Sequence, residues 1–417
     1  MQFVGFYSSL AFVVIVILSY MDLRTTSKKL LLVFLIFFTS LVFSFNLLID
    51  RRNDNSGYTE LARSFLNGRV YLMHISKNED YAFYNSKHYL HQGPFPALVL
   101  LPLVATFDLI GIPFYQSYFQ IVLFLGTFYL IYRVAKRFGF SKEDSSYLAF
   151  AFCFASVYQS LLLISLSSFL AQIFCVFLLF LVVNEFLGRR RYFVIGVICS
   201  FVFATRFTAG LISLFFVVEL VTNKEYTLRK RIVYLGQFLV PIIMVGFFLI
   251  LYNYARFGNV FDFGYTKAIA PSFSEKSTSF LFNIKNIPSN FYTYFFKTLK
   301  LSFITFEIPY LQVVFPGTSF FITSPVFLHL FKLKLKNRLE KLFIFTIAII
   351  LLILLSYKFS GWIQVGPRYM LDIMPFMFIL LLYSFHGLAL SVRMKSLILV
   401  SSVFNFYLFL TVFLPLS

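Results

Sequence analysis

Residues 50–96 read DRRNDNSGYTELARSFLNGRVYLMHISKNEDYAFYNSKHYLHQGPFP, a polar, aromatic-rich stretch of mixed charge. Long apolar runs that hold almost no carboxylates lie on both sides of it. Polar residues gathered in one place of so hydrophobic a chain need a reason. We interpret the stretch as the first large loop on the outer face of a multi-spanning membrane protein, and as the place of its chemistry.

The composition excludes an ordinary soluble domain. Hydrophobic residues make up 59% of the 417, the mean hydropathy is +0.83, and charged residues are 13%. Soluble domains carry about 25% charged residues. A soluble core cannot hide so much apolar surface, so we expect a bilayer to be the solvent for most of the chain.

The net charge of +19 does not indicate a nucleic-acid partner, because Lys and Arg cluster at the ends of the apolar runs. That is the positive-inside pattern of cytoplasmic loops. The three cysteines, Cys153, Cys175 and Cys199, each lie inside an apolar run and are too scattered for a metal motif. We expect them to be buried thiols.

Apolar runs of about 15 to 22 residues predict an all-α polytopic membrane protein of about twelve helices, in a single membrane domain over residues 1–417. The runs lie near 3–20, 30–48, 114–134, 146–164, 166–187, 192–206, 208–222, 233–252, 318–331, 341–357, 369–387 and 396–414. If these spans alternate, all the basic short loops fall on one side, which predicts outer loops at about 49–113, 253–317 and 358–368. The run 97–110 is short and interrupted by prolines, so we expect it to be interfacial or re-entrant within the first loop.

Two carboxylates at the start of the first loop are candidates for a catalytic base. Residues 56–68 predict a short amphipathic helix, and Asp54 precedes it. Free N–H groups at a helix N-terminus favour an ionised carboxylate, which is what a general base needs. A plain helix cap is the alternative for Asp54. Asp50 is either a second candidate base or only a marker of the interface.

Four other residues of this loop are candidates for substrate binding. Tyr58 lies on the apolar face of the predicted helix. Glu79 and Asp80 are suited to orienting an acceptor or holding a divalent cation, although adjacent acids in a loop are commonly just solvated. His91, in HQGPFP, is suited to a hydrogen bond with substrate or to a structural contact.

Two arginines lie where an outer-face site would need them. Arg206, in FATRFTAG, is at the predicted outer tip of two short helices, and a buried phosphate is a good partner for a guanidinium there. In GWIQVGPRYMLDIMPF (361–376), Arg368 and Asp372 are four residues apart, which predicts one helical face and an ion pair. Ionisable residues at membrane depth are functional candidates, and an ion pair that only fixes the helix is the alternative.

The second outer loop opens with YNYARFGNVFDFGY (252–265), whose aromatics and glycines suit a sugar-stacking surface, a lid or plain interfacial anchoring. Taken together, residues 58–72, 87–102, 252–265 and 361–376 resemble motifs of the GT-C superfamily of integral-membrane glycosyltransferases. This superfamily uses polyprenyl-phosphate sugars and includes protein O-mannosyltransferases and lipid A aminoarabinose transferases. The resemblance extends over most of the chain.

The resemblance implies an inverting hexosyl- or pentosyltransferase of cell-envelope glycan biosynthesis, in a bacterial plasma membrane with its site facing outward. The base of the family, just before a juxtamembrane helix, corresponds by position to Asp54; better-known branches have Asp-Glu there and this chain has Asp54-Asn55. The lipid phosphate would be held by Arg206 or Arg368. The implied partners are a polyprenyl-phosphate-sugar donor, a glycan, lipid or protein acceptor, and membrane lipids. No cofactor is required, and a divalent cation is possible.

Three alternatives remain open from the sequence. A transporter or flippase would show paired broken helices and internal repeats. A lipid-linked glycan ligase or polymerase would rely on arginines without an essential base. An inactive scaffold of the same fold is the third, and dependence of activity on Asp54 separates the transferase from all of them.

Overall fold

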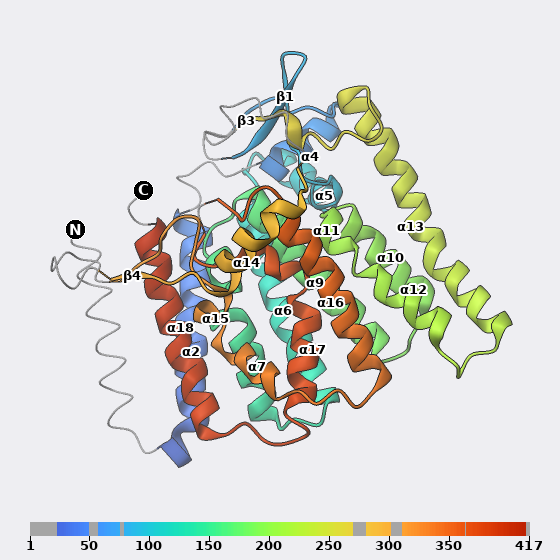
Figure 1. Cartoon of the computed structure of the whole chain (residues 1–417). Coiled ribbons are helices and arrows are strands. Elements are labelled where there is room, and N and C mark those ends of the chain that lie inside the picture. Colours follow the sequence, from blue (N-terminus) through green and yellow to red (C-terminus); the bar gives the residue numbers. More distant parts are fainter. Residues whose placement is uncertain are drawn as a thin grey trace.

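The computed structural model describes residues 23–49, 57–75, 79–269, 281–301, 311–362 and 364–413, and over these residues the chain is mostly helical (Figure 1). The predicted span at 3–20 lies outside the described residues. So do both candidate bases, Asp50 and Asp54.

Six of the described helices are long and apolar enough to cross a membrane. They are α2 (Leu23–Ser44), which the π-helical turn η1 (Phe45–Ile49) continues, α6 (Gln116–Arg137), α9 (Ser167–Phe186), α13 (Leu228–Phe257), α16 (Arg338–Ser356) and α18 (Val392–Phe413). Shorter helices complete the bundle: α7 (Lys142–Phe154), α8 (Tyr158–Leu162), α10 (Tyr192–Phe203), α11 (Phe207–Gly210), α12 (Ser213–Thr222) and α17 (Met374–Ser384). The all-α polytopic architecture is therefore confirmed.

Several of the predicted spans are not continuous α-helices. The span predicted at 208–222 consists of α11 and α12, and the span predicted at 369–387 begins as a 3-10 helix before α17. The span predicted at 146–164 breaks between α7 and α8, where the Val157 N–H donates to Ser324 Oγ at 3.1 Å and Asn405 Nδ2 donates to the Ser156 carbonyl at 3.3 Å. The span predicted at 318–331 is wrong as an α-helix. It consists of the single turn α15 (Phe320–Thr323) and the 3-10 helix η5 (Pro325–Lys332), because Pro325 lacks the N–H that would continue α15.

Helix α9 lies at the centre of the bundle, in contact with α6, α8, α10 and α17 (Figure 1). It is apolar all round, which is the pattern of a buried helix. Of the most apolar 18 residues of α9, 83% are buried, against 11% for α13. Helix α13 packs along α10 at Gly196, where a Cβ would stand 2.3 Å from the Phe238 carbonyl oxygen. On its other side α13 presents exposed apolar side chains such as Ile243, Met244 and Phe247, as a lipid-facing helix does.

One end of the bundle carries the short elements of the predicted outer loops (Figure 1). The first loop supplies α4 (Gly57–Leu66), α5 (Phe95–Leu109), β1 (Tyr81–Tyr84) and β2 (Lys87–Tyr89). The second supplies η2 (Tyr265–Lys267), β3 (Ala268–Ile269), η4 (Ile284–Asn286), α14 (Ile287–Phe295) and the antiparallel pair β4 (Lys300–Leu301) and β5 (Leu311–Gln312). The order β2-β1-β3, with Ala82 opposite both Tyr89 and Ala268, joins the two loops in one antiparallel sheet.

The amphipathic helix predicted after Asp54 is confirmed as α4, with Tyr58 and Leu61 fully buried. Helix α5 corresponds to the run predicted as interfacial or re-entrant and lies against α4 (Figure 1). Helices α2, α13, α16 and α18 all begin at the end of the bundle away from the sheet (Figure 1). The basic clusters that begin these helices therefore gather there, which is the arrangement that the positive-inside pattern predicts.

Candidate active site

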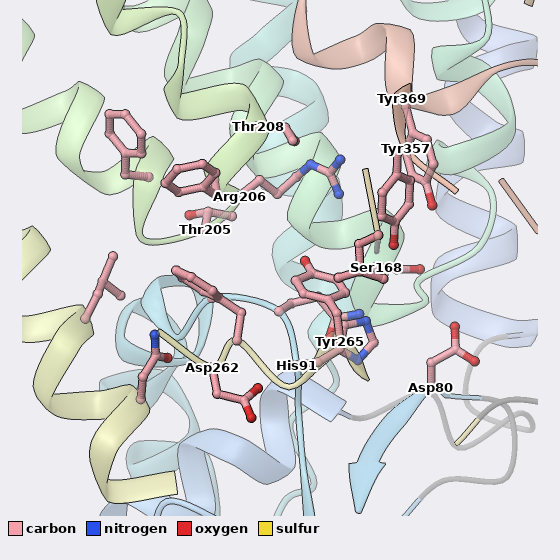
Figure 2. A pocket seen from close by; sticks show the side chains of 18 of the residues that line it. Asp80, His91, Ser168, Thr205, Arg206, Thr208, Asp262, Tyr265, Tyr357 and Tyr369 are labelled. Carbon is pink, nitrogen blue, oxygen red and sulfur yellow. The ribbon is translucent and has the colours of Figure 1, made fainter. Parts of the chain in front are cut away.

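A cavity of about 510 Å³ lies where the outer-loop segments meet the helix bundle. Its wall contains Asp80 and residues 91–94 of the first loop, residues 205–208 between α10 and α12, residues of the stretch 252–265, and residues of the stretch 361–369 (Figure 2). These are the polar stretches that the sequence singled out. The fold brings them to one place although more than 280 residues separate the first from the last.

Arg206 lies between the end of α10 and the start of α11, with its side chain at the cavity. Its Nε and Nη2 donate to the two carboxylate oxygens of Asp372 at 3.0 and 3.1 Å, and Thr208 Oγ1 donates to the same carboxylate at 2.6 Å. Asp372 is only 1% exposed. The guanidinium of Arg206 is therefore neutralised and fixed in one orientation.

The predicted ion pair between Arg368 and Asp372 is wrong. Residues Arg368–Asp372 follow Pro367 as the 3-10 helix η6, and with three residues per turn, positions i and i+4 do not share a face. Asp372 turns to Arg206 on another helix, and the pairing leaves Arg368 without the carboxylate that the sequence assigned to it.

Arg368 is a buried cation that no carboxylate of a described residue contacts. It is 6% exposed, its Nη1 donates to Ser168 Oγ at 3.1 Å, and its Nε has no partner. The guanidinium lies over the rings of Phe169 and Tyr369 at 4.9 and 5.3 Å. Among the described carboxylates none is within ion-pairing distance of it. A buried, uncompensated cation is unfavourable unless an anion joins it, and this one lines a cavity.

Arg256, in the last turn of α13, is a second such cation, and the sequence analysis did not single it out. It is 4% exposed, donates to the Leu90 carbonyl at 2.8 Å and to Asn253 Oδ1 at 2.6 Å, and lies over the rings of Tyr252 and Phe257 at 4.2 and 4.7 Å. One signal was available in the sequence. Arg256 follows a long apolar run at the end opposite to its basic cluster.

Two carboxylates of the described residues line the cavity, and they differ in their partners. Asp262 forms an ion pair with Lys267 and accepts a hydrogen bond from the Gly264 N–H at 2.7 Å. Asp80 makes no ion pair with any described residue. Burial raises the pKa of Asp80, and the nearby charge of Arg368 lowers it in part. Asp80 is therefore the carboxylate in this wall that is open to a ligand.

His91 stands among the charged groups of the cavity. Its ring meets Tyr265 edge to face at 4.9 Å, and in the view of Figure 2 the two lie between Asp80 and Asp262. Burial, with the positive charges of Arg256, Arg368 and Arg206, lowers the pKa of His91 to about 4. The imidazole is neutral at physiological pH, and its Nδ1 has no partner in the described part of the chain.

Glu79 and Tyr58 do not line the cavity. Glu79 accepts hydrogen bonds from the N–H and the hydroxyl of Ser167 at 2.8 and 2.7 Å, at the first turn of α9, and burial raises its pKa to about 7. Tyr58 is fully buried, and its N–H donates to Gln116 Oε1 at 3.0 Å. Both residues hold the first loop against the bundle, and their predicted contact with substrate stays a prediction.

The described residues contain no group of three or more His, Cys, Asp or Glu side chains that could hold a metal ion. The divalent cation therefore stays a prediction that no observed ligand set supports. The three cysteines are free and buried, as expected.

No family model matches the chain, and no curated protein matches it. Among solved structures, the apo crystal structure of the Archaeoglobus fulgidus oligosaccharyltransferase is similar, with a TM-score of 0.44 and 13% identity. The match covers 93% of this chain and 55% of that one, so this chain spans about half the length of the protein it matches. So distant a similarity carries no functional argument, and we base the function on the residues of the cavity.

Proposed function

We propose that the chain is a membrane glycosyltransferase that moves a sugar from a polyprenyl-phosphate donor to a hydroxyl of a glycan, lipid or protein acceptor. The observation that carries this proposal is Arg368, a buried guanidinium at a cavity wall with no carboxylate in contact among the described residues. A phosphate matches the planar fork of a guanidinium. Apolar side chains of Phe203, Leu249 and Leu354 line the same cavity and suit the lipid chain.

The two arginines that the sequence offered for the phosphate differ in charge balance. Arg206 already shares its charge with Asp372, whereas Arg368 does not. We therefore assign the phosphate to Arg368, whose fixed charge would stabilise the negative charge of the departing lipid phosphate. Arg206, held in place by Asp372, would orient the donor by hydrogen bonds.

The reaction needs one proton acceptor. An acceptor hydroxyl attacks the anomeric carbon, the bond from that carbon to the phosphate oxygen breaks, and the phosphate leaves with the bonding electron pair. The hydroxyl proton passes to a carboxylate, which we propose to be Asp54, with Asp50 as the other candidate.

The start of α4 supports Asp54 as that base. A Cβ on Gly57 would stand 2.4 Å from Ser167 Oγ, and the next residue, Ser168, lines the cavity. Asp54 is three residues before Gly57, and three residues extend over at most about 10 Å. Asp80, which lines the cavity, would orient the acceptor. We place the site on the outer face of a plasma membrane, as the positive-inside pattern favours.

The test is complementation of cells that lack the chain with wild type, Arg368→Gln, Arg368→Lys and Arg229→Gln at matched membrane abundance. Arg229 is an exposed arginine at the start of α13, whereas the cavity residues of this helix lie near its end, and it serves as the matched control. Lipid-linked sugars and glycans are compared by mass spectrometry.

We expect Arg368→Gln to lose one glycosyl addition and to accumulate the lipid-phosphate sugar, Arg368→Lys to retain part of the activity, and Arg229→Gln to match wild type. Full complementation by Arg368→Gln would refute the assignment of the phosphate to Arg368. Loss of the addition without accumulation of a lipid-linked sugar would point to a transporter.

A further inference from the structure

The cavity wall contains a further guanidinium, that of Arg256, which the proposed reaction does not use. Arg206 is paired with Asp372, and Lys267 is paired with Asp262. Arg368 is assigned to the phosphate of the donor. Arg256 remains, at the wall formed by the end of α13, and no described carboxylate forms an ion pair with it.

Arg256 is held as a binding residue would be. The Leu90 carbonyl and the Asn253 side chain accept two of its N–H groups, and the rings of Tyr252 and Phe257 lie against its guanidinium. A guanidinium has five N–H groups, and the N–H of Nε is buried without a hydrogen-bond partner among the described residues. The guanidinium is therefore fixed in orientation and keeps a buried donor that is unused.

Local charge does not explain this arrangement. The nearby carboxylate of Asp262 already contacts Lys267, so its charge is shared. The aromatic faces attract a cation but accept no conventional hydrogen bond from its edge. Burial, together with the charge of Arg256, lowers the pKa of His91, so this neutral neighbour offers no counter-charge. An anion in the cavity would both offset the charge and accept a hydrogen bond from the unused N–H group.

We propose that Arg256 binds a second anionic group, a phosphate or a carboxylate, in the same cavity in which Arg368 binds the donor phosphate. This inference rests on the proposed function and narrows its substrates, which together bring two anionic groups. The second group has two possible sources. It is either the second phosphate of a diphosphate-linked donor or an acidic substituent of the acceptor.

The experiment measures binding to the purified full chain in nanodiscs by calorimetry. The probes are farnesyl phosphate, farnesyl diphosphate, and glucose 6-phosphate or glucuronate added after saturation with farnesyl phosphate. The variants are wild type, Arg256→Gln, Arg368→Gln and the control Arg229→Gln.

The expected pattern separates the two arginines. Farnesyl phosphate binds wild type and Arg256→Gln alike and binds Arg368→Gln at least tenfold more weakly. A diphosphate source predicts that farnesyl diphosphate binds wild type at least tenfold more tightly than the monophosphate, and that Arg256→Gln abolishes this gain. If the second anion comes from the acceptor, farnesyl diphosphate should bind no more tightly than the monophosphate. The acidic sugar should instead bind to wild type that is saturated with farnesyl phosphate, and this binding should be at least tenfold weaker in Arg256→Gln.

Two results would overturn the inference. One is an Arg256→Gln protein that binds farnesyl phosphate normally and shows wild-type binding of every second probe. The other needs no variant: loaded wild type that binds no acidic sugar and does not prefer the diphosphate has no second anion site. If farnesyl phosphate itself fails to bind wild type, the proposed function fails, and the acidic sugars added alone still decide whether Arg256 binds an anion.

Discussion

The ion pair between Arg206 and Asp372 offers the sharpest test of how the cavity wall is built. The pair joins the tip of α10 to η6 by two hydrogen bonds of 3.0 and 3.1 Å, with side-chain exposures of 14% and 1%. The perturbation is a double-mutant cycle of Arg206→Met, Asp372→Leu and the double variant that carries both substitutions.

Burial sets the magnitude. Removing one partner of a buried pair leaves the other charge uncompensated, which destabilises by about 3–5 kcal/mol. Water screens this pair little, because both side chains are largely buried, so we expect each single variant to lose an amount in that range. Replacing both partners by apolar residues removes the stranded charge, and such replacements are often close to neutral. The double variant should therefore be more stable than either single variant, with a coupling of about 3 kcal/mol or more in the cycle.

The assay is equilibrium unfolding in mixed micelles of a mild detergent and sodium dodecyl sulfate, followed by circular dichroism. Glycosyl transfer measured in parallel separates folding from function, because the double variant should be stable yet inactive. Additive losses, with the double variant the least stable of the three, would refute a coupled buried pair.

Three further predictions concern single positions. A Cβ on Gly93 would stand 2.1 Å from the Ala204 carbonyl oxygen, so Gly93→Ala should displace the cavity wall and abolish transfer. The control is Gly236→Ala on α13, where a Cβ meets nothing within 4 Å; this variant should retain activity and fold at least as stably as wild type. Equal activity of the two variants would contradict the close packing at Gly93. Burial raises the pKa of Glu79 from 4.5 to about 7, so the folded state binds this proton more tightly than the unfolded state does. The free energy of unfolding of wild type should therefore fall as the pH rises through that range. In a pH series of unfolding curves, Glu79→Gln should reduce this slope. Burial also raises the pKa of Asp80, so transfer that needs its carboxylate should decline on the acid side at a higher pH than for a free aspartate, and an unchanged acid limb in Asp80→Asn would exclude it from the site.

The sequence predicts the local elements well, because they depend on short-range patterns. The amphipathic period after residue 56 predicts α4, and the apolar runs predict the long helices. The choice of Arg206 and Arg368 as candidates is also a local inference, since ionisable residues at membrane depth are uncommon. Asp80 and His91 are candidates because they lie in the polar first loop. All four line the same cavity.

The pairing of charges could not be predicted from spacing alone. Arg368 and Asp372 suggest an ion pair only if a regular α-helix continues through Pro367, and the chain forms a 3-10 turn there. The actual partner of Asp372 is Arg206, 166 residues away. The role of Arg256 could not be predicted for the same reason, because which carboxylates of the described residues pair with it depends on how the whole cavity wall packs.

Helix breaks were equally hidden from local patterns. The chain turns at Ser156 and Val157 without proline or glycine, because Ser324 and Asn405 supply hydrogen bonds to the freed backbone groups. The pattern of residues 146–164 does not predict those partners. Tertiary contacts of this kind decide where an apolar run stops being one helix.

The central claim is that a carboxylate ahead of α4 takes a proton from the acceptor while a lipid phosphate leaves. Its most direct measurement compares glycans and lipid-linked sugars in cells that carry wild type, Asp54→Asn or Asp50→Asn at matched membrane abundance. We predict that Asp54→Asn alone loses one glycosyl addition and accumulates the polyprenyl-phosphate sugar. Profiles of Asp54→Asn that are identical to wild type would contradict the claim, and the same loss in Asp50→Asn alone would move the base to that residue.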